Sequence, residues 1–249
     1  MPFFLNPLKA EKILEKYLDQ NAQKAFKLLV KTIIFPQILQ NKFNSNTNRS
    51  IIYPLEFIEE HLASVFNAKQ IGEGSYPVDL KIENEFLDIK VVQAKLTQSG
   101  NLSNSESGES SLGQKFTDFG DFSLDTLFDN KRYNEICECW KNILKNKYKA
   151  VFKDHGNQPI SYMFVIKCGN YFLISVLNLN IEYINLISAD IARTRNSRTT
   201  KSVFLNNFID ERFGNAKIYK SKKRLELRLR PKYLLENGFA VKLNTNFVK

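Results

Sequence analysis

Two aspartates and a lysine stand close together in residues 76–90, which read YPVDLKIENEFLDIK. Two short runs of alternating apolar residues flank a polar turn there; Asp79 lies in the first run, and Asp88 and Lys90 lie in the second. Two carboxylates suit a divalent cation, and an amine beside them can orient water or stabilise charge that grows on a phosphate. These residues therefore have what metal-assisted hydrolysis of a phosphodiester requires.

Strand geometry would bring the three side chains together. Residues two apart in a strand share a face, so Asp88 and Lys90 point the same way. Asp79, on the preceding antiparallel strand, can approach Asp88 across the turn. Two aspartates in one site repel each other unless a cation lies between them, and Mg²⁺ suits such a site because it prefers hard oxygen ligands.

A third carboxylate is expected from the helix that precedes the hairpin. Glu59 borders the apolar stripe of this helix and is our candidate, which would support a second metal ion. Glu56 and Glu60 point further from the stripe and remain alternatives.

The segment Pro77-Val78-Asp79, eight residues, then Asp88-Ile89-Lys90 resembles the signature of the PD-(D/E)XK nucleases. Val78 departs from a strict Pro-Asp element. Members of this family carry an acidic residue on a helix before the hairpin, as Glu59 would be. The resemblance implies an α+β fold with a restriction-endonuclease-like core, in which helices flank a mixed central β-sheet. It also implies a Mg²⁺-dependent phosphodiesterase that acts on DNA, often as a homodimer.

The net charge of +10 is concentrated late in the chain. From residue 193 onward there are about 15 Lys and Arg against about 4 Asp and Glu, whereas the first 192 residues are close to neutral. A basic segment of this kind suits a polyanion, usually nucleic acid, although a merely solvated basic surface is the alternative.

The expected DNA contacts lie in three segments. Arginine reads guanine edges, asparagine reads adenine, and cations and hydroxyls bind phosphates. The candidates are Arg193, Arg195, Asn196, Arg198 and Lys201 in a basic loop, Lys222, Lys223 and Arg224 at a hairpin turn, and Asn104 and Gln114 in a Ser/Gly-rich stretch.

The remaining pattern predicts a mixed α+β chain. Helices are expected over 10–42, with a break near Pro36, and over 54–66 and 124–148. Strands are expected over 75–82, 85–94, 160–166 and 171–177, with a basic β-rich C-terminal region that includes a strand pair over 217–229. Residues 96–121 read as a long loop, and 181–191 have no clear type.

We expect a single nuclease domain, with an N-terminal helical region over 1–50, a catalytic core over 51–180 and a basic DNA-contacting region over 181–249. The sequence has no run of about 18 apolar residues and no signal-peptide pattern at its start, so we expect a cytoplasmic protein without a membrane partner. Its three cysteines form no disulfide framework, and no Cys/His group has zinc spacing.

The sequence thus favours a Mg²⁺-dependent, sequence-specific double-stranded DNA endonuclease of the type II restriction class. A homodimer would match a palindromic site. One alternative is a structure-directed repair or recombination nuclease with the same hairpin. Another is a non-catalytic DNA-binding protein, in which Lys90 merely pairs with Asp88 at an edge hairpin.

Overall fold

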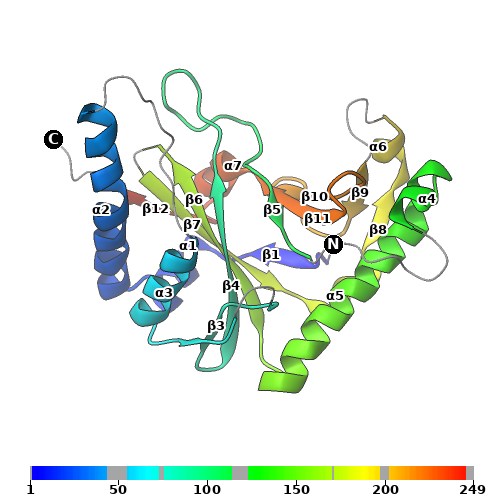
Figure 1. Ribbon diagram of the computed structural model, residues 1–249, viewed down its shortest axis with the longest axis horizontal. Coiled ribbons are helices and arrows are strands. Elements are labelled where there is room, and N and C mark those ends of the chain that lie inside the picture. The colour runs from blue at the N-terminus through cyan, green and yellow to red at the C-terminus, as the bar shows by residue number, and fades with distance from the viewer. Residues whose placement is uncertain are drawn as a thin grey trace.

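The computed structural model describes residues 2–43, 55–72, 76–113, 123–169, 171–196 and 202–244. The fold is α+β, with a mixed central sheet flanked by helices and a second, smaller sheet packed beside it (Figure 1). The expected fold class is therefore confirmed at this level.

The central sheet is formed by seven of the described strands. They are β1 (Leu5–Pro7), β2 (Lys69–Gln70), β3 (Leu80–Ile82), β4 (Glu85–Gln93), β6 (Ile160–Cys168), β7 (Tyr171–Leu179) and β12 (Val241–Asn244). Six of them follow the order β1-β7-β6-β4-β3-β2, and β12 also pairs with β7. β4 and β6 are parallel, and the other neighbours are antiparallel.

Strand β4 is covered on both faces, and its side chains alternate between them. Leu87 and Ile89 belong to one apolar cluster, and Phe86 and Val92 belong to the other. Asp88 and Lys90 have the parity of Phe86 and Val92, so they point to the second face. A strand between two cores is rigid, which makes it a firm support for these two side chains.

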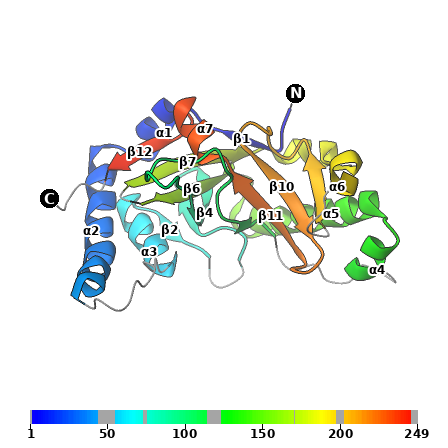
Figure 2. The ribbon, with the colours of Figure 1, turned by 90° about the horizontal axis from the view of Figure 1, so that it is seen from above.

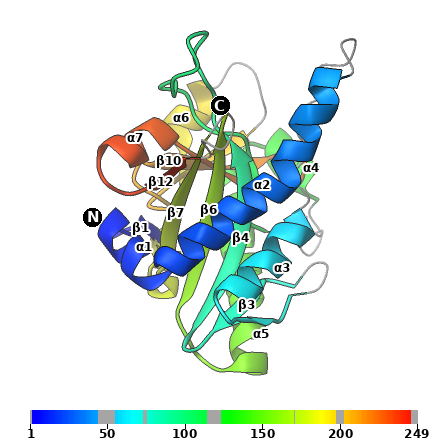
Figure 3. The same ribbon diagram turned by 90° about the vertical axis from the view of Figure 1, so that its left-hand side faces the viewer.

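Three helices cover the first face of the central sheet, as Figure 3 shows for α2 and α3. They are α1 (Ala10–Lys16), α2 (Gln20–Phe43) and α3 (Leu55–Val65). Their apolar side chains pack on the sheet in one buried cluster, which includes Ile13, Leu18, Phe26, Ile58 and Leu62. The amphipathic pattern that predicted these helices thus corresponds to this contact.

The second face carries the long helix α5 (Tyr133–His155) and the smaller sheet, and α4 (Leu124–Asp129) packs on α5 at the end remote from the central sheet (Figure 2). Helix α5 connects β4 to the parallel strand β6. The smaller sheet has the order β5-β11-β10-β9-β8. Its strands are β5 (Ser110–Ser111), β8 (Ser188–Asp190), β9 (Ser202–Asn206), β10 (Gly214–Tyr219) and β11 (Arg224–Leu229).

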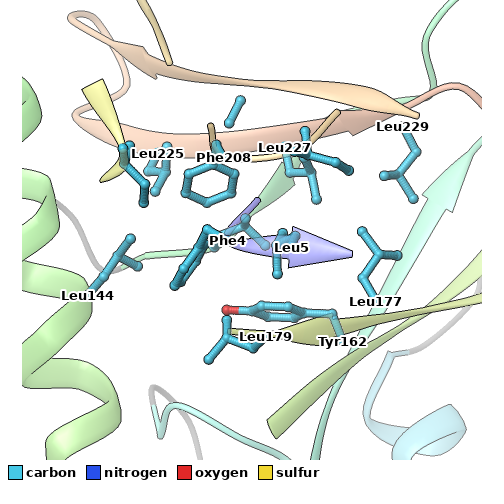
Figure 4. Packing of buried hydrophobic residues seen from close by; sticks show 14 of the residues in the cluster. Phe4, Leu5, Leu144, Tyr162, Leu177, Leu179, Phe208, Leu225, Leu227 and Leu229 are labelled. Carbon is cyan, nitrogen blue, oxygen red and sulfur yellow. The ribbon is translucent and has the colours of Figure 1, made fainter. Parts of the chain in front are cut away.

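Strand β1 of the central sheet, together with Phe4 before it, packs against the smaller sheet. Figure 4 shows Phe4 and Leu5 between Leu225 and Leu227 of the smaller sheet and Tyr162 of the central sheet. Phe4 and Leu5 are fully buried. Because β1 and β12 both pair with β7, segments from near both ends of the chain complete the sheet that carries the candidate site.

The remaining short elements complete the C-terminal part. They are a 3₁₀ helix (Ile181–Leu186), α6 (Ile191–Asn196) and α7 (Pro231–Glu236). The segment predicted as a basic loop over 193–201 is wrong in its first part, because residues 193–196 are helical. Residues 197–201, with Arg198 and Lys201, lie outside the described residues.

The helix break predicted near Pro36 is also wrong. Helix α2 continues through Pro36, and the break lies between α1 and α2. At that break Leu18 is fully buried and Asp19 accepts a hydrogen bond from the backbone N of Ala22 at 2.7 Å. A side-chain cap therefore begins α2 at this point, whereas a proline removes only one hydrogen bond of a long helix.

The helix predicted over 124–148 is two helices. Ser123 caps α4, Lys131 has a positive φ of 56° between α4 and α5, and α5 continues to His155. The strand predicted over 75–82 is shorter, since β3 begins at Leu80. Residues 96–113 hold β5 rather than only a loop, and Gln114 lies outside the described residues.

Candidate active site

Asp79 is placed where β3 begins beside β4. Its backbone N donates to the carbonyl of Leu87 at 2.9 Å, and its carbonyl accepts from Ile71 and Gly72. Two residues after Leu87 on β4, the backbone N of Ile89 donates to Oδ2 of Asp79 at 2.5 Å. The side chain of Asp79 thus accepts a hydrogen bond that a backbone carbonyl of a neighbouring strand would otherwise accept. This bond holds the side chain against β4.

Gly72 allows the chain to pass close to Asp79. A Cβ atom at Gly72 would lie 2.5 Å from the carbonyl oxygen of Val78 and 3.0 Å from the Cα of Asp79. Both neighbours are backbone atoms, which cannot move aside as a flexible side chain can. The absence of a side chain at residue 72 is therefore part of how Asp79 is positioned.

Asp88 and Lys90 lie side by side on β4. The Nζ of Lys90 forms an ion pair with Oδ1 of Asp88. The side chain of Asp88 is 3% exposed, whereas that of Lys90 is 22% exposed. The pair therefore combines a buried carboxylate with an amine that partly reaches solvent.

A second lysine contacts Asp88 from helix α5. The Nζ of Lys147 lies 3.5 Å from Oδ2 of Asp88, 3.0 Å from the carbonyl of Leu112 and 3.4 Å from the hydroxyl of Tyr162. Sequence reasoning missed this lysine. The available signal was its place three residues after Leu144 and four before Val151, on the buried stripe of an amphipathic helix.

The carboxyl group of Asp79 has a strongly perturbed pKa. Burial raises it most, the charge of Asp88 raises it further, and Lys90 only partly offsets both, so that the pKa reaches about 7. For Lys90, burial opposes the charged form, but Asp88 and Asp79 outweigh burial and raise its pKa. For Lys147, burial prevails and lowers the pKa.

Glu59 also belongs to this electrostatic group. It is partly buried on α3, and its charge raises the pKa of both Asp79 and Lys90. Glu60 is exposed, and the side chain of Glu56 lies outside the described part of the structure. The structure thus brings Asp79, Asp88 and Lys90 together, places Glu59 where its charge acts on Asp79 and Lys90, and adds Lys147.

The donor set suits Mg²⁺, although a protein cage is lacking. Among the described residues, no group of three or more His, Cys, Asp and Glu side chains is arranged to hold a metal ion. Mg²⁺ is commonly held by only one or two carboxylates together with waters and substrate phosphates. Burial contributes most to the raised pKa of Asp79, and repulsion from Asp88 contributes next; a cation between the two carboxylates would relieve that repulsion.

Two of the arginines predicted to contact DNA, Arg193 and Arg195, lie on α6, at the α4 side of the molecule in Figure 1. Arg193 forms an ion pair with Glu211 at 2.8 Å and stacks on Phe204 at 4.3 Å from the ring centre. Arg195 is exposed. For Asn196 only the helical backbone is described. Their role in DNA contact stays a prediction.

The basic hairpin turn between β10 and β11 is largely paired with carboxylates. Lys222 contacts Glu109 and Glu226, and Lys223 lies 3.9 Å from Asp125. Arg224 is exposed at the start of β11. A phosphate that bound here would compete with these internal ion pairs.

Asn104 lines a cavity of about 210 Å³ between the segment after β4 and helix α7. The other lining residues are Ser103, Ser105, Arg230, Lys232, Tyr233 and Glu236. The cavity contains both signs of charge, since Lys232 lies 3.9 Å from Glu236. It is therefore a polar cavity without a dominant charge.

Comparisons with models of protein families, with curated proteins and with solved structures found no match. Among the described residues, no helix combines the length and the apolar character needed to cross a membrane.

Proposed function

We propose that this protein is a Mg²⁺-dependent endonuclease that hydrolyses phosphodiester bonds of double-stranded DNA at specific sequences, as type II restriction enzymes do. The observation that carries the proposal is the juxtaposition of Asp79, just before β3, with Asp88 and Lys90 on the adjacent strand β4, where the charge of Glu59 also acts. Such a group, with two neighbouring carboxylates and a lysine beside them, is typical of a centre that binds a divalent cation.

The order of the elements supports the same proposal. Helix α3 is followed by β2, β3 and β4, and then, after β5 and α4, by α5 and β6. Apart from β5 and α4, this order resembles the α-β-β-β-α-β core of the PD-(D/E)XK nucleases, with Asp79 just before the second strand and Asp88 and Lys90 on the third. The short strand β2, which the sequence pattern did not reveal, supplies the first strand of that order.

The residues divide the work of the proposed reaction. Asp79 and Asp88 would hold Mg²⁺, and Glu59 would add negative charge beside them. When bound, Mg²⁺ would stabilise charge on the phosphate oxygens and lower the pKa of the attacking water. Lys90 is charged and partly exposed, so it can orient the attacking water and stabilise charge on the phosphate. The side chains of Asp88 and Lys90 are held in position because both stand on the buried strand β4.

A homodimer is the expected form of such an enzyme. Cutting both strands of a palindromic site needs two equivalent centres, and a two-fold dimer provides them. The basic C-terminal region, which the sequence marks by its charge, is the proposed source of phosphate and base contacts.

Incubation with a large DNA of known sequence tests this proposal and separates it from its alternatives. We expect discrete fragments with Mg²⁺, none with EDTA, and ends that map to one recurring sequence. Cuts only at junctions, flaps or nicks would instead indicate a structure-directed nuclease. Salt-sensitive binding without any metal-dependent cut would indicate a non-catalytic DNA-binding protein.

A further inference from the structure

Lys147 is a basic group of the centre that the signature hairpin does not supply. It stands on α5, so its position depends on the packing of a helix against the second face of the sheet. Its side chain is 10% exposed. Burying an amine at that depth is costly unless it is paired and hydrogen-bonded, and Lys147 has partners for each of its three protons.

These three partners belong to three different parts of the fold. Asp88 is on β4, Tyr162 is on the parallel neighbour β6, and Leu112 follows the edge strand β5 of the smaller sheet. One ammonium group thus links the carboxylate of the centre to the smaller sheet. The hydroxyl of Tyr162 is held in turn by a hydrogen bond with that of Tyr148.

The two carboxylate oxygens of Asp88 are each paired with a different lysine. Lys90 contacts Oδ1 of Asp88, and Lys147 contacts Oδ2. Without Lys147, the carboxylates of Glu59, Asp79 and Asp88 would face a single ammonium group. A phosphate diester that approached would meet a more negative centre.

We propose that Lys147 is a positioning residue of this centre, which orients Asp88 through Oδ2 and offsets the negative charge that an anionic substrate meets. The inference rests on the proposed function, because it assigns Lys147 to the same reaction. It adds α5 to the elements that form the centre, beside the β3–β4 hairpin and α3.

The proposal predicts opposite effects on metal binding and on cleavage. Lys147→Met removes a positive charge that opposes a divalent cation at Asp88, so Mn²⁺, used as the probe in place of Mg²⁺, should bind at least about fivefold more tightly. Cleavage of a DNA substrate should fall at least about tenfold, mainly through a higher KM. Lys147→Arg keeps the charge and should restore Mn²⁺ affinity toward that of the wild type.

Three measurements provide the test. Titration calorimetry gives the Mn²⁺ affinity of the full chain without DNA, thermal unfolding without metal gives its stability, and cleavage kinetics give its activity. Lys149→Met is the matched control, since it removes the same charge from an exposed position of the same helix. Tighter Mn²⁺ binding with slower cleavage in Lys147→Met alone would support the proposal.

Two results would overturn the proposal while the proposed function stands. One is a wild type that cleaves and a Lys147→Met variant that matches it in Mn²⁺ affinity and in cleavage. The other is a variant in which Mn²⁺ affinity, cleavage and unfolding temperature all fall together, since that reports only lost packing. A wild type that neither binds Mn²⁺ nor cuts DNA would overturn the proposed function, and with it the role of Lys147.

Discussion

At the scale of single residues, the carboxyl group of Asp79 lies in surroundings that disfavour its charged form. It is buried beside Asp88, and the backbone N of Ile89 fixes it in place. Stability is lost where a charged form is disfavoured in the folded state. This carboxyl group therefore lowers the stability of the folded state at neutral pH without a metal.

The raised pKa of Asp79 gives a signed prediction for unfolding without metal. The pKa of Asp79 is about 7 in the folded state, above its ordinary value of 3.8. Between these two pH values, the folded state therefore still holds a proton that the unfolded state has lost. Its destabilising effect is absent below pH 3.8, grows as the pH rises, and is complete above about pH 7. Asp79→Asn should raise the unfolding temperature by a few degrees at pH 8 and by much less near pH 4.

Unfolding temperatures of both proteins in EDTA across this pH range check the prediction. Glu60→Gln is the control, since Glu60 is exposed on α3. Parallel curves for the wild type and Asp79→Asn would contradict the raised pKa.

The sequence predicted these residues because their signal is local. Asp79, Asp88 and Lys90 share one hairpin, and the period of two assigns the face of Asp88 and Lys90. Lys147 is distant in the chain from Lys90, and only the packing of α5 on β4 and β6 brings the two lysines together. No short-range pattern could reveal that contact.

At the scale of elements, a buried glutamate connects α1 to the hairpin. Glu85, which begins β4, is 4% exposed. It accepts hydrogen bonds from Tyr17 at 2.7 Å and from Ser161 at 2.6 Å, and Lys16 pairs with it at 2.5 Å. Helix α1 is thereby attached to two strands of the central sheet through a single carboxylate.

Loss of one donor to this glutamate should cost stability. Tyr17→Phe leaves a buried carboxylate with one hydrogen bond fewer, which typically costs about 1–3 kcal/mol. Tyr76→Phe is the comparison, because the bond from Tyr76 to Asp154 is exposed and its loss should cost little. Urea unfolding of both variants measures the difference; an equal midpoint for both would contradict the importance of the network.

The close approach at Gly72 gives a second prediction at this scale. Gly72→Ala must displace the backbone at Val78 or Asp79, so it should lower cleavage at least about tenfold and also reduce stability. Gly108→Ala is the control, since a Cβ there would lie 3.6 Å from its nearest neighbour. Wild-type cleavage by Gly72→Ala would show that Asp79 tolerates the shift.

The elements that the sequence predicted well have regular apolar patterns. β4, β6, β7, β10, β11 and α3 lie close to their predicted ranges. The errors occur where one polar contact decides the outcome, as with the Asp19 cap that begins α2. The edge strands β2 and β5 are two residues long, too short for any period to be read from them.

At the scale of the whole molecule, the positive charge is partly neutralised from within. Glu109 pairs with both Lys222 and Arg228, and Lys220 pairs with Asp129 at 2.6 Å. A basic sequence segment is therefore a less open cationic surface than its composition suggests. Composition could predict the excess of charge but could not predict these pairs, because they join distant segments.

Removal of Glu109 should make more of this charge accessible to DNA. Glu109→Gln leaves Lys222 and Arg228 without that partner, so DNA affinity at low salt should rise several-fold and the salt dependence should steepen. Glu182→Gln, at an exposed position, is the matched control. Binding isotherms at several salt concentrations measure both effects; unchanged affinity would place DNA away from this hairpin.

The most direct measurement for the whole account is DNA cleavage by Asp88→Asn and Lys90→Ala, with binding followed in parallel. Both variants should lose Mg²⁺-dependent cleavage by at least about a thousandfold while they still bind DNA in Ca²⁺. Glu83→Gln, at the exposed turn of the same hairpin, should cleave like the wild type. Undiminished cleavage by both Asp88→Asn and Lys90→Ala would contradict the assignment of this centre.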